Sequence, residues 1–140
     1  MKIKVIKFDN YKGPDRAHYN DSGADCFAAK NMTIPAGKVA KVPTGVGVVL
    51  PDGYDICVHC KSGLSSNYGL MMANAPVDAG YRGEIHAIVY NSSDTDYHIE
   101  AGQKIGQFVV RPVIYADFVE TIDEESRGSN GFGSTGKWIT

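Results

Sequence analysis

The sequence has little leucine and no long apolar segment. Of its 140 residues only 3 are Leu, whereas Val and Ile together number 24. No apolar run approaches the ~20 residues that a helix needs to cross a bilayer, and no segment keeps apolar residues at helical spacing over a long stretch. We therefore expect no membrane partner. The excess of β-branched residues, in short runs between Gly and Pro turns, predicts an all-β domain.

Neither sign of charge dominates the sequence. Lys and Arg number 14 and Asp and Glu number 16, which gives a net charge of -2. A nucleic-acid surface usually shows a clear basic excess, so we expect no nucleic-acid partner. The first five residues alternate charged and apolar side chains, unlike the apolar core of a signal peptide. A cytoplasmic location is the default expectation, and a cellular and a viral source fit equally well.

Cysteine is scarce, and two of the cysteines have the spacing of a redox or zinc site. Two of the three Cys residues form the pattern Cys57-Val58-His59-Cys60, which occurs in redox and zinc sites. The pattern lies in a strand-like run, where side chains three positions apart point to opposite faces. No second Cys pair completes a zinc site. We therefore expect structural thiols rather than a disulfide or a metal centre.

The length of the chain indicates one domain followed by a tail of different composition. Residues 1–120 carry the β-like runs, and residues 121–140 are rich in Gly and Ser. One short helical turn is expected over 63–67. The expected strands cover 2–8, 26–29, 32–34, 38–42, 45–50, 54–60, 70–73, 85–91, 97–100, 102–110 and 113–119.

The stretch from Asn74 to Glu84 reads as a turn between two strands. It places a carboxylate, Asp78, close to an aromatic ring, Tyr81, and a cation, Arg82. A loop on a rigid scaffold can aim such side chains into a cleft. The alternative interpretation is an ordinary solvated turn, where Asp and Gly are common for backbone reasons alone.

Two further segments carry groups suited to phosphate. Lys61-Ser62-Gly63-Leu64 offers one charge, one hydroxyl and a glycine that lets backbone amides approach an anion. By itself this is a weak signal. Gln107 lies in the otherwise apolar run 105–110, where an amide is either a satisfied core group or a ligand contact. The sequence leaves both interpretations of Gln107 open.

The tail contains residues that a simple flexible linker does not need. It reads Arg-Gly-Ser-Asn-Gly-Phe-Gly-Ser-Thr-Gly over 127–136. Such a composition is typical of a mobile terminus. However, Arg127 supplies a planar fork of donors suited to phosphate, and Phe132 supplies a flat face on which a base can stack. These residues suggest an arm that orders over a nucleotide.

In combination, five separated segments resemble the trimeric dUTP pyrophosphatase (dUTPase) family, in the order found in that family. They are Ser22-Gly23-Ala24-Asp25-Cys26, Cys60-Lys61-Ser62-Gly63-Leu64, Asp78-Ala79-Gly80-Tyr81-Arg82-Gly83, Gly102-Gln103-Lys104-Ile105-Gly106-Gln107 and the tail motif 127–136. The resemblance implies a jelly-roll-like, distorted β-barrel subunit of a homotrimer. It also implies that the flexible C-terminal arm, 121–140, closes over a neighbouring active site.

The resemblance further implies the reaction and the residues that carry it. The expected activity is Mg²⁺-dependent hydrolysis of dUTP to dUMP and diphosphate, which lowers dUTP and supplies dUMP for dTMP synthesis. Asp78 would activate the water that attacks the α-phosphorus, and Asp25 would help to hold Mg²⁺ through its water shell. The implied substrate-binding residues are Lys61, Ser62, Gly63, Asn74, Val77, Tyr81, Gln107, Arg127, Phe132, Gly133 and Ser134.

Three positions depart from the family pattern. Lys61 and Lys104 stand where the family has arginines, so the charge stays but the bidentate fork is lost. Gly80 replaces the second Asp of the third motif, and the segment 74–78 is about two residues shorter than the common pattern. These departures motivate an alternative, a dUTPase-like nucleotide-binding regulatory module. A weaker alternative is a related deoxycytidine-nucleotide deaminase, against which the complete tail motif speaks.

Overall fold

A computed structural model describes residues 1–121, 128–129, 131, 133, 136 and 138 of the chain. Within these residues there are ten strands and one short helix, so the predicted all-β class is confirmed. The elements, in chain order, are β1 (Lys4–Lys7), β2 (Ala24–Phe27), β3 (Met32–Ile34), β4 (Val39–Pro43), β5 (Val46–Val49), β6 (Tyr54–His59), α1 (Ser62–Tyr68), β7 (Leu70–Met72), β8 (His86–Asn91), β9 (Tyr97–Ile99) and β10 (Lys104–Pro112).

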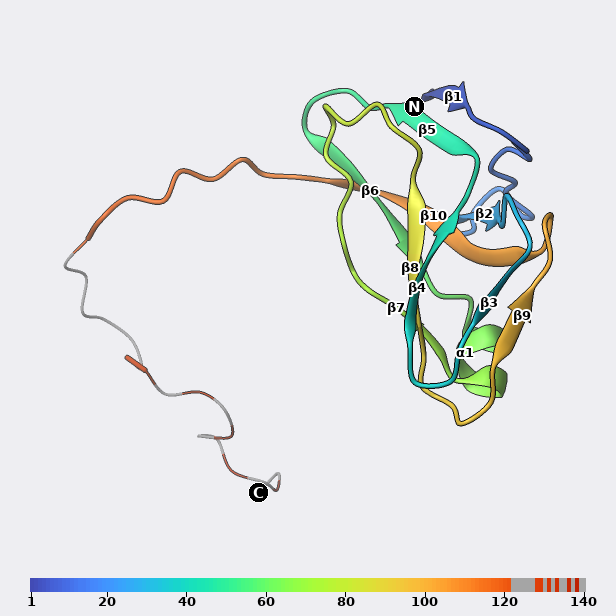
Figure 1. Cartoon of the computed structure of the whole chain (residues 1–140). Coiled ribbons are helices and arrows are strands. Elements are labelled where there is room, and N and C mark those ends of the chain that lie inside the picture. Colours follow the sequence, from blue (N-terminus) through green and yellow to red (C-terminus); the bar gives the residue numbers. More distant parts are fainter. Residues whose placement is uncertain (122–127, 130, 132, 134–135, 137, 139–140) are drawn as a thin grey trace.

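The strands pair antiparallel in four small sheets, β1-β5, β2-β10-β6, β3-β9 and β4-β8-β7. Figure 1 shows them wrapped around a common interior, with α1 at the end near β3 and β9. The long strand β10 pairs with β2 on one side and with β6 on the other. Three of the predicted motif segments are thereby brought to one place, because they lie on or directly after these three strands.

The core is built mainly from Val and Ile. Among the most deeply buried side chains are Ile34, Val42, Val46, Ile85 and Val89, each at most 2 % exposed. Branched side chains stiff at χ1 suit the close cross-strand contacts of a pleated sheet. Few leucines are therefore needed, and the composition of the chain and the architecture of its core agree.

The one helix in the described part of the chain follows β6 directly. It spans Ser62–Tyr68 and ends at Gly69, which adopts the left-handed conformation with φ 70°. The Gly69 amide donates to the Ser65 carbonyl at 3.0 Å and so closes the last turn. The helical turn predicted over 63–67 is confirmed. Among the described residues, no helix has the length and apolar character needed to span a bilayer.

The predicted last strand, 113–119, is wrong. The Val113 amide still donates to the Gly53 carbonyl at 2.8 Å, but no ladder continues beyond it in the described residues. Figure 1 shows this segment leaving the body of the molecule. Its apolar side chains lie in solvent, with Ile114 89 % and Phe118 98 % exposed. A strand is defined by its hydrogen-bonding partner, and the described part of this chain offers none for the segment.

The cysteines are all free. Cys57, on β6, is fully buried, and Nη2 of Arg111 donates to its Sγ at 2.8 Å. Cys60 lies just beyond the strand, and its Sγ is 3.9 Å from the Leu70 carbonyl oxygen. Burial raises the pKa of the Cys57 thiol and raises the pKa of Cys26 to about 12. The Cys57 and Cys60 thiols thus have separate partners, as expected for structural thiols.

Candidate functional site

A buried carboxylate joins three of the predicted motifs. Asp25, on β2, is 5 % exposed. Its Oδ1 lies 2.5 Å from the Nζ of Lys61, directly after β6, and its Oδ2 lies 3.1 Å from the Nζ of Lys104, the first residue of β10. We call Asp25, Lys61, Lys104 and Gln107 the phosphate cluster. The sheet β2-β10-β6 holds these four side chains together although they are far apart in the sequence.

The two ammonium groups keep Asp25 ionised. The hydrogen bond from Lys61 lowers the pKa of the Asp25 carboxyl, burial acts in the opposite direction, and the hydrogen bond from Lys104 lowers it again. The net result is a pKa below the usual value. A buried charge without such partners would be strongly unfavourable. Asp25 and its lysines therefore depend on one another.

Gln107 is held in the cluster by the Cys60 carbonyl and packs closely against Gly23. Its Nε2 donates to the Cys60 carbonyl at 3.1 Å, and its backbone stands opposite Asp25 in the β2–β10 ladder. A Cβ on Gly23 would come within 2.6 Å of Gln107 Oε1, and one on Gly106 within 2.8 Å of the His59 carbonyl oxygen. These glycines are needed for close approach. Gln107 is half-buried, so its amide retains hydrogen-bonding capacity beyond the bond to Cys60.

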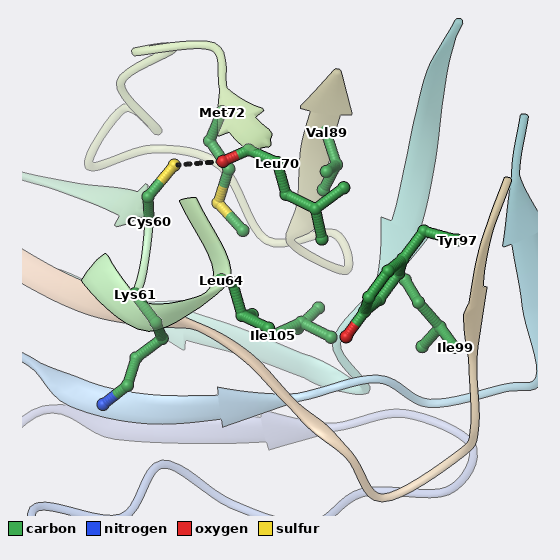
Figure 2. Close-up of a pocket in the computed structure, with 9 residues that line it drawn as sticks. All are labelled: Cys60, Lys61, Leu64, Leu70, Met72, Val89, Tyr97, Ile99 and Ile105. Atoms are coloured by element: carbon green, nitrogen blue, oxygen red, sulfur yellow. Dashed lines mark hydrogen bonds between the residues drawn. The ribbon is translucent and has the colours of Figure 1, made fainter. Parts of the chain in front are cut away.

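Ser62 and Gly63 open α1 next to the cluster, and both are exposed. Beneath the helix lies a small cavity of about 10 Å³ lined mostly by apolar side chains. Figure 2 shows that the ammonium of Lys61 points away from this cavity, while Leu64 fills it from the helix. A space of this size holds one water at most. The cavity is therefore a packing gap of the core, and the charged group of its lining, the Lys61 ammonium, faces away from it.

The loop 73–85, which contains the stretch Asn74–Glu84, is held at both ends. Near its start, Val77 exchanges two backbone hydrogen bonds with Ile56 of β6, at 2.8 and 3.2 Å. At its end, Glu84 Oε2 accepts from the Gly45 amide at 2.8 Å, and the Ile85 amide donates to the Val46 carbonyl at 2.8 Å. The turn between these anchors is the predicted one, and its position is fixed by the core.

Tyr81 folds back over this turn. Its hydroxyl donates to the Glu84 carbonyl at 2.9 Å. A Cβ on Gly83 would lie 2.6 Å from Tyr81 Cζ, so only glycine leaves room for the ring. At Gly80, by contrast, nothing lies within 4 Å of an added Cβ. The two glycines of the third motif thus have different roles, one packing against Tyr81 and one facing open space.

Asp78 lies in the same turn with its carboxylate exposed. Within the described residues, no hydrogen bond or ion pair involves this carboxylate. Asp78 and Tyr81 line a cavity of about 280 Å³ together with Lys41, Glu84 and His86. We call this cavity the hairpin pocket. An exposed carboxylate without a competing partner is available to hold a water or another ligand.

Sequence reasoning missed part of this lining. Lys41 and His86 are neighbours of the hairpin pocket because β4 pairs with β8, where Lys41 stands opposite Ile88 and Pro43 opposite His86. No local motif marks these two residues. Lys104 was noted only as a replaced arginine, although its position in the fourth motif was a signal for a place in the site.

Two predicted binding residues have limited contacts in the hairpin pocket. Val77 is part of its lining, but Ile56 takes both of its backbone polar groups. Asn74 is exposed and lies outside the pocket lining. Three others, Arg127, Phe132 and Ser134, lie outside the described residues. Gly133 is described and has a φ of 93°, a value that favours glycine.

The phosphate cluster and the hairpin pocket lie apart on one chain. Val77, in the hairpin pocket, is bridged to Ile56 of β6. Lys61, in the cluster, is five residues after Ile56, just beyond the end of β6. At the rise of a β-strand this separates the two backbone positions by roughly 16 Å. The cluster and the pocket lining also share no residue. One chain therefore brings the predicted residues together in two groups rather than one.

The acidic side chains of the site suit Mg²⁺ only in the company of substrate phosphates. In the part of the chain that the structure describes, no three His, Cys, Asp or Glu side chains are grouped so that they could hold a metal ion. Mg²⁺ typically keeps several waters and binds one or two carboxylates plus substrate phosphates. The ionised Asp25, with a lone pair left on each oxygen, fits a metal that arrives with a polyphosphate. It does not fit a metal held by protein ligands alone.

Comparison with known proteins identifies relatives along nearly the whole chain. A family model for dUTPase matches residues 9–136. The chain is 40% identical over 141 residues to the deoxyuridine 5'-triphosphate nucleotidohydrolase of Clostridium tetani, covering 98% of this chain and 97% of that protein. It is 46% identical over 132 residues to that of Leifsonia xyli, covering 91% and 87%.

Solved structures give the same result. Staphylococcus bacteriophage 80alpha dUTPase with dUpNHpp superposes with a TM-score of 0.88 at 28% identity, over 96% of this chain and 98% of that chain. A point mutant of the dUTPase of phage phi11 of S. aureus, which coordinates a structural Mg(II) ion, has a TM-score of 0.82 at 24% identity, over 88% and 98%. The similarity to the phi11 dUTPase, at 24% identity, indicates a shared fold.

Proposed function

The chain belongs to the dUTPase family, and we propose that its phosphate cluster and hairpin pocket are the two halves of the dUTP site. The activity of the family, hydrolysis of dUTP, is that of this chain. The observation that carries the proposal is the exposed, unpaired carboxylate of Asp78 beside Tyr81 in the hairpin pocket of the described residues.

Asp78 is the general base in this proposal. It accepts a proton from a water molecule as the oxygen of that water forms a bond to the α-phosphorus. The bond from the α-phosphorus to the bridging oxygen breaks, diphosphate leaves, and the water oxygen remains on dUMP. A general base must reach the water within about 2.6–3.2 Å, and no other group competes for Asp78 among the described residues.

The phosphate cluster binds the triphosphate. The ammonium of Lys61, the hydroxyl of Ser62, the backbone around Gly63 and the amide of Gln107 are donors at one edge of the sheet β2-β10-β6. Donors fixed in advance stabilise the charge that develops on phosphate oxygens. When bound, Mg²⁺ neutralises phosphate charge and orients the chain of phosphates. Asp25 would contact its water shell.

The hairpin pocket selects the nucleoside. Tyr81 is fixed by its bond to the Glu84 carbonyl and by Gly83. A ring held in this way packs against deoxyribose and collides with a 2′-hydroxyl. Asn74 and Val77 are proposed to contact the base. A site that pairs its hydrogen bonds rejects a mispaired base, because buried polar groups would lose their partners.

We propose a homotrimer in which each site combines groups from different copies. Two features support it. On one chain, the backbone of Lys61 lies roughly 16 Å from that of Ile56, to which Val77 of the hairpin pocket is bridged, and this separation favours a site shared between copies. In addition, Ile114, Tyr115, Phe118 and Val119 are exposed in a segment without a partner strand among the described residues, and apolar patches of this kind commonly mark protein interfaces.

The tail completes the proposed site. Residues 121–140 form an arm that crosses to a neighbouring copy, where Arg127 binds phosphate and Phe132 covers the base, with Gly133 and Ser134 beside them. Closure of such an arm excludes water and strengthens each polar contact. In the cell the reaction lowers dUTP and supplies dUMP for dTMP synthesis.

The test is diphosphate release from each deoxynucleoside triphosphate and from UTP, with Mg²⁺ and with a chelator. We expect release from dUTP, strong dependence on Mg²⁺, and little release from UTP or dCTP. Equal release from UTP would contradict the role of Tyr81. Full activity with the chelator would contradict the role of the metal.

A regulatory role is the second candidate, because the 80alpha dUTPase is described as controlling the transfer of virulence genes. In its strict form this hypothesis predicts tight dUTP binding with no diphosphate release. Turnover of dUTP by the purified chain would exclude that strict form.

A further inference from the structure

The turn between β4 and β5 holds the end of the loop that carries Tyr81. The amide and the hydroxyl of Thr44 both donate to the Ile85 carbonyl, at 3.2 and 2.6 Å. The Ile85 amide donates to the Val46 carbonyl at 2.8 Å. Thr44 and Ile85 are each 2% exposed, so these contacts are shielded from water and form a rigid base directly after Glu84.

Glu84 joins the loop to this base through its side chain. Its Oε2 accepts a hydrogen bond from the Gly45 amide at 2.8 Å. Among the described residues, Glu84 is the one member of the stretch 74–84 whose side chain hydrogen-bonds outside that stretch. The side chains of Tyr81 and Arg82 donate to carbonyls within it. The carboxylate of Glu84 is therefore the side-chain link between the loop and the core.

The partner of this carboxylate is fixed in place. Gly45 is buried and has a φ of 72°, and a Cβ there would lie 3.1 Å from Tyr11 Cα. Its carbonyl accepts from the Phe8 amide at 2.9 Å. A buried amide needs a partner, since leaving it unpaired is costly. The Gly45 amide thus offers a fixed donor to the Glu84 carboxylate.

The backbone of Glu84 holds the Tyr81 ring. The Tyr81 hydroxyl donates to the Glu84 carbonyl at 2.9 Å, and His86 Nδ1 lies 3.2 Å from the same oxygen. Tyr81 is 46% exposed, so packing fixes the ring only in part and its hydroxyl contact matters more. Through its side chain and its carbonyl, Glu84 therefore connects the ring to the buried turn at Thr44 and Gly45.

We infer that Glu84 is a positioning residue. Its carboxylate, bound to the Gly45 amide, keeps the Glu84 carbonyl where it fixes the Tyr81 ring, and the preference for deoxyribose over ribose depends on this contact. The inference rests on the proposed function, since it takes Tyr81 as the residue that excludes the 2′-hydroxyl. Glu84 acts through Tyr81 and needs no contact of its own with the substrate.

The first experiment follows the ring itself and does not depend on activity. The full chain is labelled with 3-fluorotyrosine, and its ¹⁹F NMR spectrum is recorded without nucleotide. Tyr81→Phe identifies the Tyr81 signal among those of the 8 tyrosines. Glu84→Ala should move this signal toward that of free fluorotyrosine, whereas Glu84→Gln, which keeps an acceptor oxygen, should leave it near the wild-type position.

Unchanged signals from the other tyrosines show that a variant is folded. If Glu84→Ala does not fold, Glu84→Asp takes its place, because it keeps the charge but shortens the side chain that reaches Gly45. A Tyr81 signal that stays at the wild-type position in the folded variant would overturn the inference.

The second experiment measures kcat/KM for dUTP and for UTP with Mg²⁺. Glu84→Ala should lower the value for dUTP about tenfold, because a displaced positioning group can cost up to about a hundredfold. The value for UTP should change less than about twofold, so the preference for dUTP falls about fivefold or more. Glu84→Gln should retain most of the preference. An equal loss for both substrates would indicate general damage to the site and contradict the inference.

The control is Glu100→Ala, which removes the same charge from an exposed position between β9 and β10. Both kcat/KM values should stay within about twofold of wild type in this variant, because exposed charges contribute little. A fall in dUTP preference as large as that of Glu84→Ala would mean that loss of a negative charge, and not of the contact with Gly45, is responsible.

Tyr81→Phe removes the same contact from its other end. Since Glu84 acts through the Tyr81 hydroxyl, the two substitutions should not be additive. In the Tyr81→Phe background, Glu84→Ala should lower the dUTP preference by less than about twofold further. Full additivity would overturn the inference. If the wild-type chain releases no diphosphate from dUTP, the proposed function and the sugar preference fail together, whereas a displaced ¹⁹F signal would still support the positioning of the ring by Glu84.

Discussion

The phosphate cluster and the hairpin pocket differ in how their charged groups are held. In the cluster, the Asp25 carboxylate is buried and paired with two lysines, Lys104 at the start of β10 and Lys61 directly after β6. In the pocket, the Asp78 carboxylate is exposed and, among the described residues, unpaired, on a loop anchored only at its ends. Both residues are aspartates of sequence motifs, yet their surroundings give them opposite properties.

The difference separates binding from chemistry. A carboxylate that is saturated by cations can organise charge but cannot readily take a proton, because its ionised form is favoured. A carboxylate on an open loop can accept a proton from water. In the proposed site, the rigid sheet thus carries the groups that would bind phosphate, and the loop carries the group that would react. The following predictions are ordered from the largest expected effect to the smallest.

Asp78→Asn should lower kcat by about 10²–10⁴-fold, the usual contribution of a general base. The affinity for dUpNHpp should change little, because the amide keeps the size of the side chain. Steady-state kinetics and calorimetry measure the two quantities. Asp52→Asn, in an exposed turn, is the matched control. A wild-type kcat in Asp78→Asn would remove Asp78 from the mechanism.

Gly83→Ala should displace the Tyr81 ring, because the added methyl would lie 2.6 Å from the ring carbon that bears the hydroxyl. A misplaced positioning group can cost up to about a hundredfold, and we expect a loss of about tenfold or more in kcat/KM for dUTP. The preference for dUTP over UTP should fall as well. Gly80→Ala is the control in the same loop, since an added Cβ there meets nothing.

An unchanged dUTP preference in Gly83→Ala would show that the Tyr81 ring does not select the sugar. A loss of similar size in Gly80→Ala would show instead that the loop as a whole is sensitive to substitution. The pair therefore separates a contact of one ring from a general property of the turn.

Asp25→Asn should reduce the free energy of unfolding by about 1–2 kcal/mol at pH 7, through loss of two charged hydrogen bonds to half-exposed lysines. The folded-state pKa of Asp25 is lowered, so its stabilisation is complete above the unfolded pKa of about 3.9. It is lost as pH falls through the folded pKa. Urea unfolding at fixed protein concentration, from pH 7 to pH 3, measures the difference.

The gap between wild type and Asp25→Asn should therefore shrink below about pH 4. Asp52→Asn should show almost no gap at any pH, because its side chain is exposed in a turn. A gap for Asp25→Asn that stays constant down to pH 3 would mean that its carboxylate is not stabilised by the lysines.

Gly80→Asp should have the smallest effect. It restores the second aspartate of the third family motif at a position with open space around it. The new charge would be exposed and screened, so we expect kcat/KM within about threefold of wild type. Steady-state kinetics at low and high salt measure this. A large loss would show that Asp78 depends on the absence of a second carboxylate.

Much of the fold could be predicted from local patterns. Strand β3 has the predicted bounds, 32–34, and the helical turn after β6 is where the Gly-containing segment predicts it. The segment 113–119 has the same β-branched character, yet no strand forms there. The composition of a segment indicates its tendency to adopt an extended conformation. A strand also needs a hydrogen-bonding neighbour, and the described part of a single chain does not supply one for this segment.

In the candidate site, too, local patterns do not predict what depends on long-range strand pairing. Ser62, Tyr81 and Gln107 could be proposed from the sequence because each lies in a short motif whose spacing can be read directly. Lys41 and His86 were not found, because only the β4–β8 pairing places them at the hairpin pocket. Long-range register depends on packing across the whole core, and no local pattern encodes it.

By itself, then, the sequence determined the all-β class, the family and the identity of the motif residues, because β-branched composition and motif spacing are properties of neighbouring residues. Only the tertiary structure decided that Asp25 meets Lys61, 36 positions away, and Lys104 on a third strand. It also decided that Asp78 stays free of partners among the described residues. Burial and charge pairing arise between strands that are distant in the chain, and they gave these two aspartates different chemistry.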